Sequence, residues 1–341
     1  MGVRDMVEQT MDGSGRIRVA AIDLGTVSSR LSLAEIEAGA PVDARKHTLI
    51  TDLGEGVDAT GRFCDEAVGR VVSACRTFVE EARAFGATCI CTTLTSAARD
   101  ADNAQVLLGQ LSGLGLVPQV IPGEVEARLT FYGVARDFPG ERIAVADSGG
   151  GSTEIAVGAL SSGGEVGLER VQSLNIGCRR VTDRFFHGNP PSCADVQEAA
   201  RWSADQFTSY WTGLDDRPER LVAVGGTVTT LVAITHELER YDPAFVHLHE
   251  LSVAEIEGCI DRMKPLTVAQ IAQLKGIQPK RAHVMLAGAV VMRELMRAGG
   301  YDVLTVSENS LLAGMAATIG ETLVKGKTAI GWVPELSYLA H

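Results

Sequence analysis

The sequence lacks several features that would place it in other classes of protein. Its seven cysteines contain no CxxC pair, which favours reduced thiols in a cytoplasmic protein. No stretch reaches the roughly 18 uninterrupted apolar residues of a membrane span, and the polar residues 1–16 contain no apolar signal core. We therefore expect a soluble, cytoplasmic protein with no membrane partner, in which residues 1–16 form a flexible leader.

Positive charge is also scarce. The chain has 31 Lys and Arg against 43 Asp and Glu, so its formal net charge is −12. This balance argues against a protein that coats nucleic acid or an anionic membrane through a general positive field. Any anionic ligand must be bound by local charges.

Two common nucleotide-binding fingerprints are missing. The GKT at Gly326–Thr328 is not part of a P-loop, because position 321 is Glu and the nearest glycine, Gly320, is one place off. The Rossmann glycine pattern is absent as well. No low-complexity segment or Pro-rich linker divides the chain.

Short apolar runs alternate with longer amphipathic ones from Ile17 onward, which is typical of an α/β protein. The 341 residues allow two globular domains, since single domains mostly have about 100–200 residues. The predicted strands are Arg18–Asp23, Ser29–Glu35, Thr88–Thr93, Pro118–Ile121, Ile143–Asp147, Thr153–Val157, Arg170–Leu174, Leu221–Val224 and Val303–Val306. The predicted helices are Cys64–Ala84, Ala101–Leu111, Gly123–Phe138, Ser192–Tyr210, Val228–Thr235, Val253–Arg262, Thr267–Leu274, Lys280–Ala298 and Glu308–Leu323.

Two segments of the chain resemble each other. AAIDLGTVSSRLSL (Ala20–Leu33) and AVADSGGGSTEIAV (Ala144–Val157) each consist of a strand ending in Asp, a small-residue turn with Gly and hydroxyl groups, and a returning strand. Two equivalent hairpins suggest two related lobes. Chance similarity of two β-hairpins is the alternative, and the resemblance between the two segments does not decide between related lobes and chance.

The second of these turns has the composition of a phosphate loop. The run Gly149–Gly151 lets consecutive backbone N–H groups converge on an anion, and Ser152 and Thr153 add hydroxyl donors. The flanking acids Asp147 and Glu154 would repel phosphate by themselves, so they indicate a hard cation such as Mg²⁺. A Gly-rich turn between two strands can also be mere architecture.

Other segments place similar residues after a predicted strand. In VAVGGTVTTL, Gly225, Gly226 and Thr227 open a helix, where free N–H groups and the helix dipole favour an anion. Three strand-end loops of this composition are hard to explain as independent turns. The remaining candidates in such loops are Asp23, Thr26, Ser28, Arg30, Ser96 and Arg99.

The segments AIDLGTVSSRL, TSAARDADN, IPGEVEARLTFYGV, VADSGGGSTEI, NIGCRR, VGGTVTTL and VSENSLLAG resemble, in order and spacing, the Ppx/GppA family of exopolyphosphatases and guanosine pentaphosphate phosphohydrolases. The resemblance covers about Arg18 to Gly320. It implies an α/β, actin-like fold of the sugar kinase, Hsp70 and actin superfamily, with two RNase H-like lobes and a central cleft. We expect lobe I to contain residues 17–136 and 310–341, and lobe II residues 137–309. The absence of a His-Asp dipeptide favours the short form of the family, without additional C-terminal helical domains.

The resemblance also implies a reaction, the hydrolysis of the terminal phosphoanhydride of inorganic polyphosphate with release of orthophosphate. Guanosine pentaphosphate is the alternative or second substrate, Mg²⁺ or another divalent cation the cofactor, and a homodimer the implied assembly. Glu126 takes the place of the general base, and Arg30 and Arg99 are candidates for neutralising charge in the transition state. The implied metal ligands are Asp147, Glu154 and Asp23. The implied phosphate-binding residues are Thr26, Ser28, Gly149, Gly150, Gly151, Ser152, Gly226 and Thr227.

Some positions depart from the family pattern. Val125 replaces a glutamate, Val27 a usually polar residue, and Ser148 a usually aliphatic one. Val125 and Val27 keep open the alternative of a protein that senses polyphosphate or the alarmone without turnover. An actin-like kinase that transfers phosphate to a small acceptor is a separate alternative. Retention of Glu126 together with the two acids of the glycine turn argues against the sensor, because a pure binder of polyanions gains nothing from buried acids.

One basic cluster has two interpretations. Lys275, Lys280, Arg281 and His283 could form a local basic rim for a long polyanion. A solvated helix face explains the same pattern equally well.

Overall fold

The computed structural model describes residues 15–214 and 216–339 and divides into two compact units. Unit 1 consists of the described residues of Met1–Pro139, Leu160–Gly167 and Ser310–His341, and unit 2 of those of Gly140–Ala159 and Leu168–Asn309. The expected leader, residues 1–16, lies outside the described residues except for Gly15 and Arg16. Each unit has its own sheet and its own hydrophobic core.

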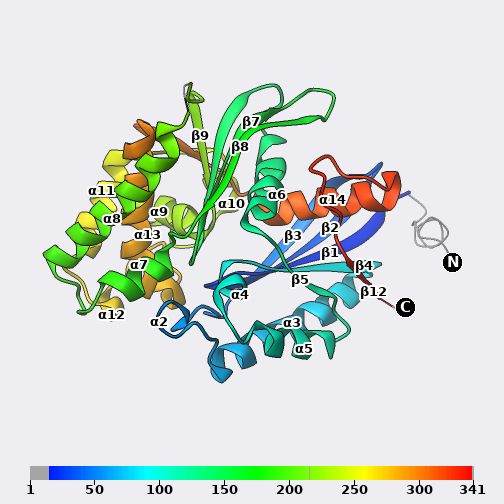
Figure 1. The fold of residues 1–341 in the computed structure, drawn as a ribbon, viewed down its shortest axis with the longest axis horizontal. Coiled ribbons are helices and arrows are strands. Elements are labelled where there is room, and N and C mark those ends of the chain that lie inside the picture. The colour runs from blue at the N-terminus through cyan, green and yellow to red at the C-terminus, as the bar shows by residue number, and fades with distance from the viewer. Residues whose placement is uncertain (1–14, 215, 340–341) are drawn as a thin grey trace. The chain divides into compact units, whose positions relative to one another are not determined.

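The sheet of unit 1 has the strand order β12-β4-β1-β2-β3, with β5 also paired to β4 (Figure 1). Strand β1 is antiparallel to β2 and parallel to β4, and β4 is parallel to β5. The central strands read as near-continuous apolar runs because both of their faces are covered. The bounds are β1 Ile17–Leu24, β2 Ser28–Glu37, β3 Ala40–Ile50, β4 Cys89–Leu94, β5 Pro118–Val120 and β12 Leu336–Tyr338.

Helices cover both faces of this sheet. In Figure 1, α3 (Asp65–Phe85) and α5 (Ala104–Ser112) lie on one face, and α6 (Gly123–Ala135) and α14 (Leu311–Lys325) on the other. Buried side chains of β1, α3 and α5 form the core on the first face. The short helices of the unit are α2 Val57–Thr60 and α4 Ser96–Asp100.

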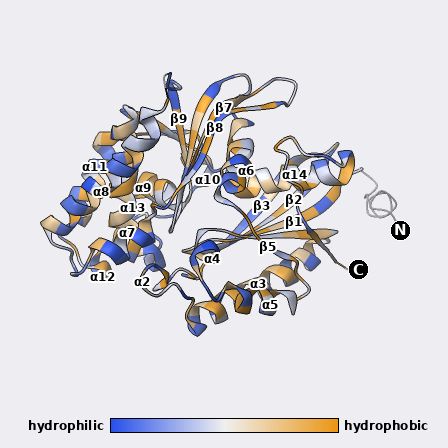
Figure 2. Ribbon diagram, viewed as in Figure 1, coloured by the Kyte–Doolittle hydropathy of each residue, from blue (hydrophilic) through white to orange (hydrophobic). Residues whose placement is uncertain are grey.

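The sheet of unit 2 has the strand order β10-β11-β9-β6-β7-β8. Strand β6 is antiparallel to β7 and parallel to β9, and β9 is parallel to β11. Strand β7 is mostly buried and consists largely of hydrophobic residues, as its colour in Figure 2 shows. The bounds are β6 Arg142–Ser148, β7 Thr153–Leu160, β8 Val166–Leu174, β9 Arg220–Val224, β10 His249–Ser252 and β11 Val303–Val306.

The helices of unit 2 begin where the sequence supplies caps. Ser192 and Ser252 each form a capping box, with Asp195 and Glu255 respectively, at the starts of α8 and α11. The core of the unit gathers the large side chains Phe207, Tyr210 and Trp211 of α8. The helices are α7 Cys178–Phe185, α8 Cys193–Thr212, α9 Gly226–Thr235, α10 Pro243–Val246, α11 Val253–Met263, α12 Val268–Ile271 and α13 Ala282–Gly299, with a 3₁₀ turn at Pro279–Arg281.

The two sheets share one topology. In unit 1 the order β3-β2-β1-β4-β5 consists of an antiparallel meander followed by two parallel strands, and β8-β7-β6-β9-β11 repeats it in unit 2. The hairpins β1–β2 and β6–β7 occupy the same place in this order. These are the two segments that resemble each other in sequence, so the structure supports two related lobes over chance similarity.

Each predicted strand is present, but the sequence pattern missed β3, β10 and β12. Strand β3 pairs with β2 along its length although most of its side chains are exposed, so it shows no apolar alternation. The predicted helix Glu308–Leu323 begins only at Leu311, and Thr267–Leu274 shortens to α12. Among residues 15–214 and 216–339, no helix is long and apolar enough to cross a membrane.

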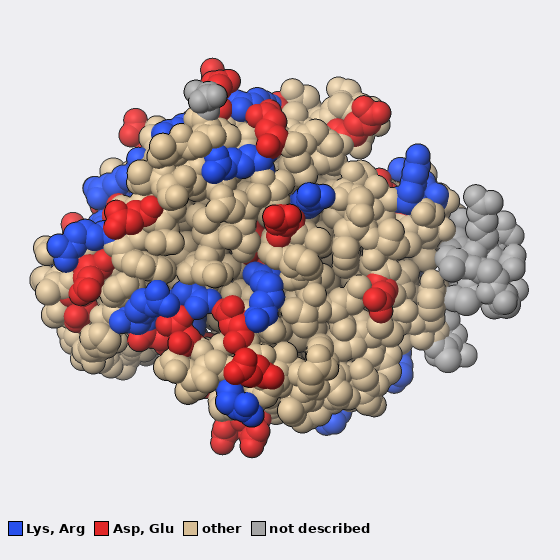
Figure 3. Space-filling view, viewed as in Figure 1, with Lys and Arg blue, Asp and Glu red and all other residues tan. Residues whose placement is uncertain are grey.

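Charged side chains of both signs are interspersed on the face shown in Figure 3. Among the described residues on that face, no continuous positive surface is visible, as the net charge of −12 leads one to expect. An anionic ligand therefore requires a local site.

Candidate active site

In unit 1, the ends of three parallel strands bring the predicted residues to one edge of the sheet. Strands β1, β4 and β5 run in the same direction, so the segments that follow them emerge together. Asp23 lies at the end of β1 and Thr26 follows it, Arg99 lies in α4 after β4, and Glu126 lies in α6 after β5. The topology thus gathers residues that lie up to a hundred positions apart in the sequence.

Asp23 is fully buried and pairs with Arg30 across the first hairpin. The two residues are direct partners in the β1–β2 register, and Nη2 and Nε of Arg30 lie 2.7 and 2.8 Å from Asp23 Oδ2. The other oxygen, Oδ1, has no hydrogen-bond partner among the described groups. A buried carboxylate oxygen without a partner is costly. This atom is therefore suited to face a cation or a ligand.

The turn between β1 and β2 is closed by the backbone. The amide of Gly25 donates to the carbonyl of Ser28 at 3.0 Å, and the amide of Gly54 donates to the carbonyl of Thr26 at 2.8 Å. A Cβ at Gly54 would lie 2.2 Å from Cγ2 of Thr26, so only glycine permits this approach. Thr26 is buried and Ser28 half-buried. Gly54 was not predicted as part of the site.

Glu126 lies in the first turn of α6 and is held by Arg99. Nη1 of Arg99 is 2.8 Å from Glu126 Oε2, and it also donates to the carbonyl of Ile121 at 3.0 Å. Both side chains are largely withdrawn from solvent. The arginine therefore orients a buried carboxylate at the edge of the sheet.

In unit 2 the glycine loop between β6 and β7 lies against the start of α7. The carbonyl of Gly149 accepts from the amide of Cys178 at 3.0 Å, and that of Gly150 from the amides of Arg179 and Arg180 at 2.8 and 3.1 Å. The carbonyl of Gly151 accepts from Nε of Arg180 at 2.8 Å. All three glycine carbonyls are thus directed toward α7.

The direction of the glycine carbonyls also determines which way the N–H groups of the loop point. In a trans peptide the N–H points away from the preceding C=O, so the amides of Gly150, Gly151 and Ser152 point away from α7. Those of Gly150 and Gly151 donate to no described group. A row of such amides is an anion-binding arrangement. The loop has the geometry expected of a phosphate cradle.

Gly177 allows the start of α7 to lie against the glycine loop. It was not predicted as a site residue. A Cβ there would lie 2.4 Å from the carbonyl oxygen of Gly150 and 2.7 Å from the amide nitrogen of Gly151. The residue lies in the segment NIGCRR, whose glycine was the available signal. Its role depends on a partner 27 positions earlier in the chain (177 minus 150), which the sequence does not reveal.

Asp147 and Glu154 face each other across the β6–β7 hairpin. They are direct register partners, so their side chains share one face, and both are buried. Like charges directly opposite each other destabilise a sheet unless something compensates them. Oε1 of Glu154 accepts a hydrogen bond from Ser173 Oγ at 2.7 Å.

The second loop of unit 2 follows the neighbouring strand β9. Because β6 and β9 are parallel and Asp147 pairs with Val224, the Gly225–Thr227 turn lies beside the Asp147 carboxylate. A Cβ at Gly225 would be 2.8 Å from Asp147 Oδ1, and the backbone there has φ +94°. Gly226 opens α9, and Thr227 is buried beside it.

Arg281 lies directly on this loop. The position of a Cβ at Gly226 would be 2.0 Å from Nη1 of Arg281, so the guanidinium rests against the glycine. Arg281 is buried, and its Nε has no hydrogen-bond partner among the described groups. The solvated-face interpretation of the basic cluster is therefore wrong for Arg281, which the sequence placed only in a general basic rim.

The donor set fits a hard divalent cation. In unit 2, Asp147 and Glu154 supply carboxylate oxygens, which Mg²⁺ prefers. In unit 1, Oδ1 of Asp23 lacks a hydrogen-bond partner among the described groups. Within the described part of the chain, no group of three or more His, Cys, Asp or Glu side chains is arranged to hold a metal. Mg²⁺ is commonly bound by one or two carboxylates together with substrate phosphates and water. The residues therefore fit such a site and not an all-protein cage.

A two-lobed fold with backbone amides, hydroxyl groups and acids at its strand ends defines a phosphate-handling protein. Residues 32–319 match the Ppx/GppA phosphatase family. The chain is 36% identical over 319 residues to exopolyphosphatase 2 of Mycobacterium tuberculosis strain H37Rv, covering 89% of this chain and 98% of that protein. The chain belongs to the Ppx/GppA phosphatase family.

Solved structures agree with this assignment. An exopolyphosphatase-like protein superposes with a TM-score of 0.83 at 32% identity, over 91% of this chain and 99% of that one. The Aquifex aeolicus member of the Ppx/GppA family gives a TM-score of 0.73 at 29% identity, over 92% and 100%. With the repeated sheet order, these matches confirm the expected α/β, actin-like fold and the prediction of a phosphohydrolase.

Proposed function

We propose that the chain is an exopolyphosphatase that removes the terminal phosphate of inorganic polyphosphate. The observation that carries the proposal is the glycine loop of unit 2, whose carbonyls are directed toward α7 so that its amides are left for an anion. The name of the mycobacterial relative supports polyphosphate as the substrate. The net charge of −12 makes such a built loop necessary for a polyanion.

The phosphate groups are bound by the loops of unit 2. Backbone amides of Gly150, Gly151 and Ser152, with the hydroxyl of Ser152, donate to phosphate oxygens. The start of α9 at Gly226 and Thr227 adds amides at a helix N-terminus. Arg281 lies against the same turn and supplies positive charge there.

Glu126 is the proposed general base. It takes a proton from a water molecule, whose oxygen forms a bond to the terminal phosphorus while the bond from phosphorus to the bridging oxygen breaks. The products are orthophosphate and a chain shorter by one phosphate, which leaves with the bridging oxygen. Arg99 holds the carboxylate of Glu126 in place, and its charge, with that of Arg30, opposes the negative charge of the transferred group.

In unit 2, Asp147 and Glu154 are the residues that would hold Mg²⁺ or another divalent cation, and in unit 1 the candidate ligand is Asp23. Such a cation would supply charge neutralisation for the phosphate oxygens. It would also compensate the cross-strand pair of acids in the β6–β7 hairpin.

Guanosine pentaphosphate is the second proposed substrate, because it ends in the same kind of phosphoanhydride. A cytoplasmic location and a homodimer are further proposals that the family resemblance alone carries.

The test compares Glu126→Gln with Glu124→Gln, an exposed glutamate in the same helical turn. Phosphate release from long-chain polyphosphate is measured with Mg²⁺ and with a chelator. We expect metal-dependent release that falls about a hundredfold or more in Glu126→Gln, the scale for loss of a general base, and little in Glu124→Gln. Binding of polyphosphate or guanosine pentaphosphate by the wild type without any release would replace the enzyme with a sensor.

A further inference from the structure

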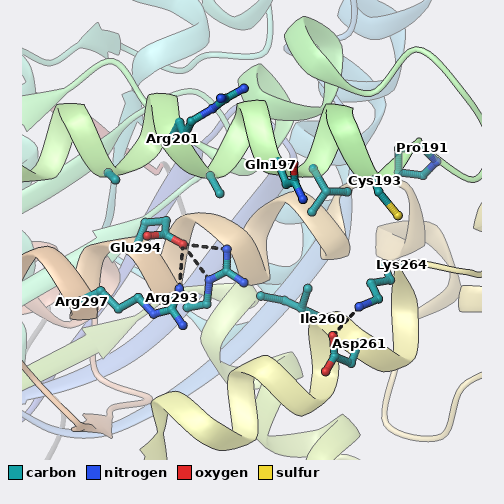
Figure 4. A pocket seen from close by; sticks show the side chains of 13 residues that line it. Pro191, Cys193, Gln197, Arg201, Ile260, Asp261, Lys264, Arg293, Glu294 and Arg297 are labelled. Atoms are coloured by element: carbon teal, nitrogen blue, oxygen red, sulfur yellow. Dashed lines mark hydrogen bonds and ion pairs between the residues drawn. The ribbon is translucent and has the colours of Figure 1, made fainter.

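A concave site separate from the residues described above lies wholly within unit 2, in a groove among α8, α11 and α13 (Figure 4). Its volume is about 530 Å³, which is in the range of small-molecule pockets. None of the residues assigned above to phosphate, metal or proton transfer lines it. The lining residues are Pro191, Cys193, Val196, Gln197, Ala200, Arg201, Ala204, Ile260, Asp261, Lys264, Arg293, Glu294 and Arg297.

One wall of the pocket is apolar and made of small side chains. Val196, Ala200 and Ala204 are spaced by four along α8, so they form a single ridge on its surface. Ile260 of α11 adds to the apolar lining. Small side chains at this spacing leave a shallow surface against which a flat apolar group can pack.

The rest of the lining is basic. Arg293 and Arg297 project from α13, Lys264 from the end of α11, and Arg201 from α8. Three carboxylates accompany these four cations, namely Asp261 and Glu294 of the lining and Glu257, which forms an ion pair with Arg297, so the local excess is one positive charge. This local excess occurs in a chain whose net charge is −12.

The arginines are held in position by a buried acid. Oε1 of Glu294, whose side chain is only 9% exposed, lies 2.7 Å from Nη2 of Arg293 and 3.6 Å from Nη1 of Arg297 (Figure 4). Nε of Arg293 also donates to Glu294 Oε1 at 2.7 Å, and Arg297 also forms an ion pair with Glu257. A guanidinium has five N–H donors, so each arginine keeps donors for a ligand. Lys264 pairs with Asp261 at 2.7 Å at the exposed rim.

We propose that this pocket binds a nucleotide carrying one or two phosphates. The phosphate is bound by Arg293, Arg297 and Lys264, and the base packs on the ridge of α8. An inorganic anion would leave the apolar wall uncovered, and a long polyphosphate chain would carry far more charge than an excess of one can balance. A nucleotide has a flat base for the apolar wall and a phosphate for the basic side chains, so it matches both parts of the lining.

A cysteine makes occupancy directly measurable. Cys193 lines the pocket and is exposed, whereas Cys64 of unit 1 is half-buried and the remaining five cysteines are buried. We would measure the alkylation rate of Cys193 by mass spectrometry, with Cys64 as the internal reference. The probes are AMP and GMP, which contain no phosphoanhydride bond and cannot be substrates of the proposed reaction, alongside inorganic phosphate, pyrophosphate and adenosine.

We expect AMP or GMP to slow alkylation of Cys193 about fivefold or more at saturation, because pocket ligands are largely buried, and to leave Cys64 unchanged. Lys264→Glu removes a charge-assisted contact at the exposed rim, so the affinity should fall about tenfold or more. Gln197→Trp fills the pocket from an exposed position of α8 and should abolish protection. Lys327→Glu, an exposed site in unit 1, is the matched control and should bind as wild type does.

Three results would overturn the proposal. The first is no protection of Cys193 by millimolar nucleotide, and the second is protection that survives both Lys264→Glu and Gln197→Trp. The third is equal protection by inorganic phosphate or pyrophosphate, which would show a plain anion site that does not use the apolar wall. Because the readout involves no turnover, loss of the proposed exopolyphosphatase activity would leave this inference standing.

Discussion

Arg99 and Glu126 form an ion pair at 2.8 Å, although helix α5 and strand β5 separate their helices α4 and α6 in the chain. The same Nη1 atom of Arg99 donates to the carbonyl of Ile121, directly before α6 begins. The guanidinium of Arg99 therefore links the carboxylate of Glu126 to the backbone segment that leads into α6, the helix that carries Glu126. This relationship makes Arg99 a positioning residue for the proposed base.

Replacing Arg99 with Met should lower kcat with a smaller effect on KM. Without the guanidinium the carboxylate of Glu126 can rotate, and a misplaced catalytic group costs about a hundredfold. Arg99→Lys, which keeps the charge, should retain more activity. Steady-state kinetics on polyphosphate give the split between kcat and KM, and adding Glu126→Gln to Arg99→Met should cost little more because the two residues act as one unit. Fully additive effects would contradict this assignment.

Gly177→Ala should weaken substrate binding while the fold persists. The new Cβ would press on the carbonyl of Gly150 and shift the amides of the glycine loop. Displacing one hydrogen bond to a charged group costs about 1.5–3 kcal/mol, so KM should rise about tenfold or more. Gly258→Ala in α11, where a Cβ meets nothing within 4 Å, is the matched control. An unchanged KM in Gly177→Ala would show that the loop does not bind substrate.

Asp147→Asn should raise the Mg²⁺ concentration that gives half-maximal activity. The substitution removes one of two opposed buried charges, so the attraction for a cation falls by about tenfold or more on the scale of one charged contact. Activity is measured in a Mg²⁺ titration after treatment with a chelator. Asp43→Asn, at an exposed position of β3, controls for the loss of charge. Equal Mg²⁺ dependence of the two variants would exclude Asp147 as a ligand.

Gly314→Ala should destabilise unit 1. A Cβ at Gly314 would lie 1.8 Å from the carbonyl of Leu129, because α14 and α6 approach each other at small residues. Forcing the helices apart costs about 1–3 kcal/mol of unfolding free energy. Gly109→Ala in α5 meets nothing within 4 Å and should stabilise by about 0.5–1 kcal/mol. Chemical denaturation measures both, and equal stabilities would show that the two helices tolerate separation.

The protein should become less stable as the pH falls below about 6.5, because the unfolded chain then protonates His249 more readily than the folded protein does. Burial, and then the nearby His236, lowers the pKa of His249 from its ordinary value of 6.5, although Glu255 and Glu250 act in the opposite direction. Between the folded pKa and 6.5 the unfolded chain binds the proton more readily, so the free energy of unfolding decreases as pH falls through this window.

Denaturation at a series of pH values tests this dependence. His249→Gln should show a shallower loss of stability between pH 7 and the folded pKa than the wild type. His187→Gln, at an exposed position, should keep the wild-type slope. Parallel slopes for all three proteins would contradict the assignment to His249.

Much of the fold was predictable because its strands are short apolar runs that end at distinctive turns. Strand β3 was missed since it is an exposed strand with polar side chains, stabilised by pairing with β2. Helix α7 was missed because only Cys178 and Val181 are buried in it, so no apolar period was visible. Both elements form through contacts with partners that a local pattern does not contain.

The site shows the same division. The glycine turn and its two acids were recognisable from composition, since glycine, hydroxyl and carboxylate groups cluster within a few residues. Gly177 was not assigned a role, and Arg281 was placed only in a general basic rim, because each contacts a loop far from it in the chain, Gly177 at Gly150 and Arg281 at Gly226. The ion pair of Arg99 with Glu126 likewise depends on the parallel order of β4 and β5.

Residue types along the chain were enough to predict the two hairpins with acids and glycines at their turns, and a net charge of −12 means that any anionic ligand would need a local site. Residue types did not show that the glycine carbonyls turn toward α7 with the N–H groups on the other side, or that Arg281 rests on Gly226. Residue type fixes which groups a loop can offer, whereas hydrogen bonds and close contacts with segments remote in the chain set the direction of those groups.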